Sequence, residues 1–142
     1  MDTETTTDQY QNLLFGSCGI WITGHLHRFI LFHDDSLGKS QTEIVKEFSG
    51  QSVQGVLLEV MTRNEFIESV FYAWAYDARA LCVGFNLPFD LSRLATAYGL
   101  ARKRYTNGFS LKLSESEFHP RIRIKSLDSK RAFIEFGQVN NG

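Results

Sequence analysis

The spacing of apolar and polar residues changes several times along this chain, and each change predicts an element. Residues 13–23 and 25–33 mix β-branched and bulky apolar side chains with partial alternation, which predicts two strands in a hairpin that turns near Thr23-Gly24. Residues 34–40 (D-D-S-L-G-K-S) have the composition of a loop, and residues 53–60 predict a third strand. The first third of the chain is therefore expected to be mainly β.

A capping box marks the start of a helix in the middle of the chain. Thr62 and Glu65 have the spacing at which each side chain satisfies the backbone N–H of the other residue. Apolar residues then recur at helical intervals, which predicts an amphipathic helix over 63–78 whose buried stripe is Phe66, Ile67, Val70, Phe71 and Trp74.

A strand and a second helix are predicted next. Residues 80–85 (A-L-C-V-G-F) form a short continuous apolar run, as in buried strands. Pro88 favours the first turn of a helix, and the apolar stripe that follows extends to Tyr98, with Gly99 as the expected stop.

The last part of the chain is predicted to be rich in strands. A basic, turn-prone segment over 103–108 precedes strand candidates at 109–113, 119–127 and 132–136. The order of strands, helix, strand, helix and strands predicts an α/β or α+β fold with a mixed sheet.

Composition narrows the class of protein. The 142 residues fit one domain, and 43% hydrophobic residues with 12 Phe can form a normal core. No apolar run approaches the ~20 residues of a membrane span, and the acidic, polar start does not have the pattern of a signal peptide. Cys18 and Cys82 form no disulfide framework. We expect a cytoplasmic protein with reduced thiols and no membrane contact.

Charge divides the chain into two parts. Residues 1–100 hold 12 acids and 6 bases, whereas residues 101–142 hold 4 acids and 9 bases, so a net charge of −1 conceals a −6/+5 split. Such a split can combine a carboxylate site with a flank that attracts phosphates, although a mixed solvated surface has the same composition.

Two short motifs carry candidate chemistry. In D-T-E-T, Asp2 and Glu4 project from the same face if the segment is a strand, and a hard divalent cation would relieve their mutual repulsion. A frayed polar N-terminus would have the same residues. In N-L-P-F-D, Asp90 falls in the first turn of the predicted helix, where a carboxylate is also stabilised by the helix dipole alone.

Together, D-T-E-T at 2–5 and V-G-F-N-L-P-F-D-L-S-R-L at 83–94 resemble the first and second motifs of the DnaQ-like (DEDD) 3′-5′ exonucleases, which include the proofreading domains of DNA polymerases. The resemblance implies a ribonuclease-H-like fold, with an exonuclease-like core over 1–100 and a basic, β-rich continuation or insertion over 101–142. It implies that Asp2, Glu4 and Asp90 bind two divalent metal ions, Mg²⁺ or Mn²⁺, and catalyse hydrolysis of phosphodiester bonds.

The same resemblance assigns supporting residues and partners. Asn86 and Phe89 would support the site, and Leu91 and Leu94 would pack its helix. The substrate would be a single-stranded or frayed DNA 3′ end, and a polymerase domain would be a possible partner. The tract Arg102, Lys103 and Arg104 would hold phosphates, with Arg121, Arg123 and Lys125 as further candidates.

The third motif of that family is absent from this sequence. No Tyr is followed by Asp at the fourth position, and no His is followed by Asp at the fifth. We therefore expect a truncated exonuclease domain. Two alternatives stay open: a catalytically inactive domain that binds nucleic acid or a partner, and an unrelated α/β domain in which both motifs are accidental.

Overall fold

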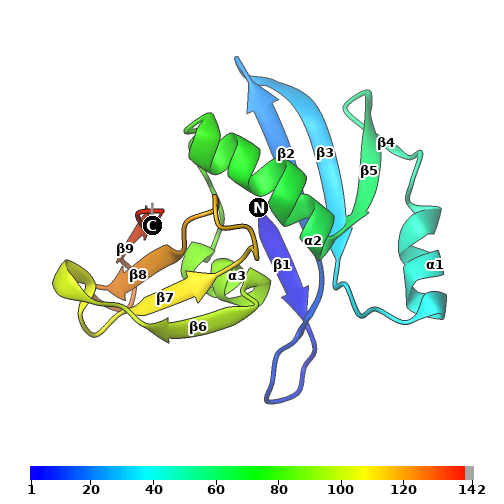
Figure 1. Ribbon diagram of the computed structural model, residues 1–142. Helices are drawn as coiled ribbons and strands as arrows, with labels where there is room; N and C mark the ends of the chain where they lie inside the picture. Colours follow the sequence, from blue (N-terminus) through cyan, green and yellow to red (C-terminus); the bar gives the residue numbers. More distant parts are fainter. Residues whose placement is uncertain (140–142) are drawn as a thin grey trace.

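The computed structural model describes residues 1–139 and contains two sheets with a long helix between them (Figure 1). The five-stranded sheet has the order β1 (Asp2–Thr5), β2 (Leu13–Ile22), β3 (His25–His33), β5 (Val56–Thr62) and β4 (Ser52–Val53). The four-stranded sheet consists of β6 (Ala97–Leu100), β7 (Phe109–Lys112), β8 (Ile122–Ser126) and β9 (Ala132–Phe136).

The first sheet is mixed, because β3 and β5 run parallel while its other pairs are antiparallel. The described helical segments are α1 (Lys39–Glu47), α2 (Arg63–Phe66), the π-helix η1 (Ile67–Asp77), α3 (Leu87–Leu94) and the 3₁₀ turn η2 (Lys103–Tyr105). The predicted α+β class with a mixed sheet is confirmed. No helix among the described residues is long and apolar enough to cross a membrane.

The predicted capping box is present and starts the central helix. The Glu65 N–H donates to Thr62 Oγ1 at 3.1 Å, and the Thr62 N–H donates to Glu65 Oε2 at 2.7 Å. The expected helix over 63–78 is therefore correct in place, but most of it is a π-helix. Val70, Phe71 and Tyr72 are consecutive and all buried, because the helix lies between the two sheets and contacts both of them.

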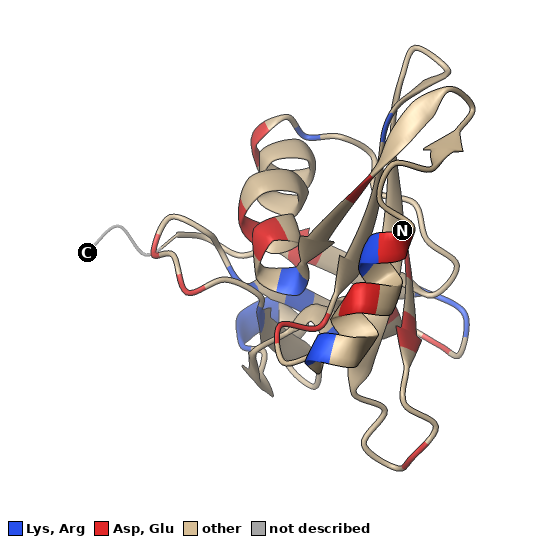
Figure 2. Ribbon diagram, turned by 90° about the vertical axis from the view of Figure 1, so that its right-hand side faces the viewer, with Lys and Arg blue, Asp and Glu red and all other residues tan. Residues whose placement is uncertain are grey.

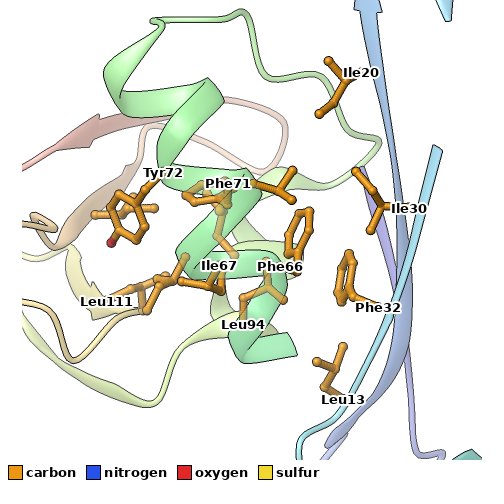
Figure 3. Packing of buried hydrophobic residues seen from close by; sticks show 14 of the residues in the cluster. Leu13, Ile20, Ile30, Phe32, Phe66, Ile67, Phe71, Tyr72, Leu94 and Leu111 are labelled. Atoms are coloured by element: carbon orange, nitrogen blue, oxygen red, sulfur yellow. The ribbon is translucent and has the colours of Figure 1, made fainter. Parts of the chain in front are cut away.

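One apolar cluster joins the two sheets through this helix (Figure 3). Phe66 stacks on Phe32 of the five-stranded sheet, with ring centroids 4.1 Å apart. Phe71 lies against Phe136 of the four-stranded sheet at 6.1 Å. Buried aliphatic residues fill the space around these rings: Ile20, Ile30, Leu91, Leu94, Leu111, Ile122 and Ile124.

Four elements differ from the sequence predictions. Residues 80–85 form no ladder with a neighbouring strand. The segment is held by two hydrogen bonds, from the Met1 amino group to Val83 O at 2.8 Å and from the Ala80 N–H to Trp74 O at 2.8 Å. The helix that was expected to extend to Tyr98 ends at Leu94, and Tyr98 lies in β6, where it pairs with Leu111.

The third difference is α1, which begins at Lys39 inside the predicted loop. None of its residues is buried, so it does not need an apolar stripe facing the core. Such a stripe is the sequence pattern from which a helix is predicted. The third predicted strand is also divided into β4 and β5 by a turn at Gln54-Gly55, where both residues have positive φ.

Candidate functional site

The two motif segments meet where β1 crosses α3. Thr3 Oγ1 donates a hydrogen bond of 2.6 Å to Asp90 Oδ1, although the two residues are 87 positions apart in the chain. Both side chains are buried, with 8% of Thr3 and 2% of Asp90 exposed. This contact is the structural centre of the candidate site.

Local sequence explains how α3 presents Asp90. Asn86 is the N-cap residue and Pro88 occupies the first turn, where its missing N–H costs nothing. Leu91 and Leu94 are buried, as predicted, and they orient the same helical face toward the core. Asp90 therefore lies in the first turn of α3, where the partial positive charge of the helix start favours a carboxylate.

A glycine on β2 allows β1 to lie close to its neighbours. Gly16 pairs with Thr3, and a Cβ atom at Gly16 would lie 2.6 Å from the backbone oxygen of Asp2 and collide with the Phe32 ring. Any side chain at this position would push β1 away from β2. The position of Thr3 against Asp90 thus depends on a glycine in the neighbouring strand.

Arg93 connects α3 to the loop between β1 and β2. Its guanidinium donates to the carbonyl oxygens of Gln11 at 3.0 Å and Tyr10 at 3.2 Å. The same group lies 5.0 Å from the centre of the Phe89 ring, in a cation–π arrangement. Phe89, which the motif named as a supporting residue, therefore helps to position Arg93, while Asn86 caps the helix without a side-chain hydrogen bond.

Asp2 and Glu4 project from the face of β1 opposite to Thr3. Successive side chains of a strand alternate between faces, and the burial of β1 follows this alternation. Asp2 pairs with Ser17 and Glu4 with Phe15, and both acids are exposed. Asp2 lines a hollow of about 260 Å³ that also includes Trp21 and Phe29.

The two-metal centre implied by the resemblance does not fit the side chains as they stand. Thr3, not Asp2 or Glu4, faces Asp90, and no group of three His, Cys, Asp or Glu side chains within residues 1–139 can hold a metal ion. One feature does suit an additional ligand: Asp90 Oδ2 is buried and has no hydrogen-bond partner. The roles of Asp2, Glu4 and Asp90 as metal ligands stay predictions.

Thr3 is a site residue that the motif analysis did not identify. The sequence does predict that Thr3 lies on the opposite face of the strand from Asp2 and Glu4, because successive side chains of a strand alternate between faces. Which face α3 covers is decided by packing between segments distant in the chain. The local sequence therefore could not predict whether the two acids or Thr3 would face Asp90.

The predicted basic tract lies apart from these segments, in and beside η2. Arg102, Lys103 and Arg104 are exposed. Arg104 pairs with Glu135 of β9, and the other two form no ion pair with a described residue. This leaves the tract with a surplus of positive charge at the surface.

A second polar cluster surrounds His119. Its Nδ1 atom lies 2.9 Å from Ser114 Oγ and 3.0 Å from Glu68 Oε2, and its ring stacks on Tyr72 at 4.0 Å. In a Ser–His–acid relay, the serine and the acid use different ring nitrogens. Here both contact Nδ1, so this cluster does not have the geometry of a nucleophile and its base.

Cys18 and Cys82 are both free thiols. Cys18 is partly buried, and burial raises the pKa of its thiol. A raised pKa lowers the thiolate fraction at neutral pH, so Cys18 does not have the activated state that a nucleophilic cysteine requires.

Comparisons of this chain with protein-family models, with curated proteins and with solved structures gave no match.

Proposed function

We propose that this chain is a DnaQ-like 3′-5′ exonuclease domain with a ribonuclease-H-like fold, acting at DNA 3′ ends within a DNA polymerase or a related nuclease. The contact between Thr3 and Asp90 carries the proposal. It brings together the two segments that resemble the first and second family motifs, and it does so at the start of α3, where the resemblance expects the acid of the second motif.

The surrounding architecture supports the same proposal. An antiparallel β1–β2–β3 unit comes first, the central helix follows, and α3 then returns to β1. Arg93 adds a second connection between α3 and the β1–β2 loop. Within this frame, Asp90 is held in place by Thr3 and retains one unused carboxylate oxygen.

A second candidate is a catalytically silent domain of the same type that binds nucleic acid. The outward direction of Asp2 and Glu4 favours it, because these acids and Asp90 do not converge on one point. Both candidates predict binding of a DNA 3′ end, and only the first predicts hydrolysis.

Release of nucleotides from a 3′-labelled oligonucleotide in Mg²⁺ or Mn²⁺ separates these candidates. The exonuclease proposal expects release by the parent chain and its loss in Asp90→Asn, in which the amide oxygen can still accept from Thr3. Asp77→Asn is the matched control, since Asp77 is exposed at the end of η1. Thermal unfolding of both variants checks that the fold is retained.

Each outcome decides between the candidates. Binding of the oligonucleotide without release supports the silent domain. Equal release by the parent chain and Asp90→Asn overturns the role of Asp90. If the parent chain neither releases nucleotides nor binds the oligonucleotide, both candidates are overturned.

A further inference from the structure

The four-stranded sheet has one apolar face and one basic face. In β8, Ile122 and Ile124 are buried in the core, so Arg123 projects from the opposite face, together with Arg121 just before the strand and Lys125 within it. These three cations follow each other at two-residue intervals and form a row about 13 Å long. On β7, Ser110 and Lys112 share this outward face, because the residue between them, Leu111, is buried.

The predicted basic tract lies beside this row. Lys125 Nζ donates to the carbonyl oxygen of Arg104 at 3.1 Å, which connects η2 to β8. The guanidinium groups of Arg104 and Arg123 both approach the Tyr105 ring, at 5.4 and 5.5 Å from its centre. Two groups of cations that are separate in the sequence therefore form one surface, at the sheet where Lys and Arg gather toward the back of Figure 2.

Acids compensate only part of this charge. Glu135 pairs with Arg104 and lies 3.5 Å from Arg123, and Glu115 pairs with Lys112. Arg121 and Lys125, like Arg102 and Lys103, have no carboxylate within ion-pair distance among the described residues. The surface therefore keeps a positive surplus that a polyanion can neutralise.

Two further features suit an extended strand of nucleic acid. The Arg121 guanidinium is held against the sheet by Ser110, with Nε donating to Oγ at 2.9 Å and Nη2 donating to the backbone oxygen at 3.0 Å. Phe133 pairs with Lys125 and is 57% exposed, so an aromatic ring lies next to the row of cations. Cations along a row with an adjacent aromatic ring are typical of surfaces that bind single strands.

We infer that the outward face of the β6–β9 sheet, extended by η2, binds the phosphodiester backbone of single-stranded nucleic acid, with Phe133 as a stacking position for a base. This surface, the basic face, consists of Arg102, Lys103, Arg104, Lys112, Arg121, Arg123, Lys125 and Phe133. It extends the phosphate-binding role that the sequence predicts for Arg102, Lys103 and Arg104 to one continuous face of the sheet. It goes beyond binding at a DNA 3′ end, because it takes internal segments of a strand and needs neither a 3′ end nor hydrolysis.

The test measures binding of circular single-stranded DNA in EDTA, where there is no 3′ end and no divalent cation. Binding of the parent chain is compared with that of Arg121→Gln/Lys125→Gln over a range of salt concentrations. Each phosphate contact on a single strand contributes about 0.7 to the slope of log affinity against log salt, so the double variant should lower the slope by about 1.4. A uridine homopolymer tests whether RNA is bound equally.

Lys39→Gln/Lys46→Gln on α1 is the matched control, because it removes the same charge from exposed positions elsewhere. It should leave the slope unchanged. Arg102→Gln/Lys103→Gln provides a second test that alters no strand residue, and it should also lower the slope by about 1.4. Circular dichroism confirms the fold of each variant.

An equal decrease of the salt slope in Lys39→Gln/Lys46→Gln and in Arg121→Gln/Lys125→Gln would overturn the inference, because it would show an effect of net charge alone. Unchanged slopes in both basic-face variants would also overturn it. Binding of vesicles containing phosphatidylserine without binding of circular DNA or RNA would assign the surface to a different polyanion and overturn it as well. If Asp90→Asn loses hydrolysis but still binds circular single-stranded DNA in EDTA, this inference is supported.

Discussion

The two sheets use the central helix in different ways. The five-stranded sheet contacts it through the aromatic stack of Phe32 on Phe66, in which both rings are almost completely buried, and through Ile20 and Ile30. The four-stranded sheet contacts it through Phe136, whose ring centroid lies 6.1 Å from that of Phe71, and through aliphatic residues. On this side of the helix the Tyr72 hydroxyl donates to Pro120 O at 2.8 Å, and burial raises the pKa of Tyr72 to about 12. Apolar packing thus dominates on one side of the helix, and packing is combined with polar contacts on the other.

The polar faces of the two sheets differ more than their apolar faces. β1 presents Asp2 and Glu4 to solvent, whereas β8 presents Arg123 and Lys125. Because the apolar faces meet in one cluster, the charge difference does not divide the core. The two sheets thus share one core but present opposite charges to solvent.

The largest effect is expected from Phe66→Ala. Removing this ring should lower the free energy of unfolding by about 3–5 kcal/mol, since it leaves a cavity against Phe32 in a fully buried position. Hydrogen exchange should show reduced protection in both sheets, because they share this helix. Reduced protection in the five-stranded sheet alone would show that the sheets unfold separately. Tyr72→Phe is a mild control that removes only the bond to Pro120.

A smaller effect is expected from Arg63→Met. This variant tests the hydrogen bonds by which the central helix is joined to the end of α3 and to the segment after β7. Arg63 is buried in α2 and donates to the carbonyl oxygens of Leu94, at the end of α3, and of Leu113, just after β7. Both oxygens would lose their donor, so we expect about 2–3 kcal/mol of destabilisation in urea unfolding.

Arg28→Met is the matched control for Arg63→Met. Arg28 is 28% exposed and pairs with Glu59, so its replacement should cost at most about 1 kcal/mol. An equal cost for the two variants would show that burial of Arg63 adds nothing.

The smallest effect is expected at Glu59, within the five-stranded sheet. The hydrogen bond from Arg28 lowers the pKa of this carboxyl from its ordinary value of 4.5. A lowered folded-state pKa stabilises the protein above the unfolded value, and this stabilisation is lost as the pH falls through the folded value. Since Glu59 is 39% exposed, the contribution should be under about 1 kcal/mol.

Glu59→Gln should therefore reduce the loss of stability between about pH 5 and pH 3, as measured by urea unfolding at each pH. Glu43→Gln on α1 is the control, because Glu43 forms no ion pair with a described residue. A pH profile of Glu59→Gln that matches the parent profile would contradict the role of this pair.

Several elements could be predicted from the sequence because they depend on neighbours a few residues apart. The Thr62–Glu65 capping box, the β2–β3 hairpin and the burial of Leu91 and Leu94 in α3 all follow from short-range spacing. The place of Asp90 in the first turn of α3 follows from Pro88 and the apolar residues after it. These are local preferences of backbone and side chain, and the tertiary structure did not alter them.

Other features were decided only by contacts between distant segments. α3 covers the Thr3 face of β1, so the acids of the first motif project outward. The basic tract joins β8 through Lys125 and Tyr105. Periodicity shows that a strand has two faces, but which face is covered depends on the free energy of packing whole elements together, and that is determined by residues far apart in the chain.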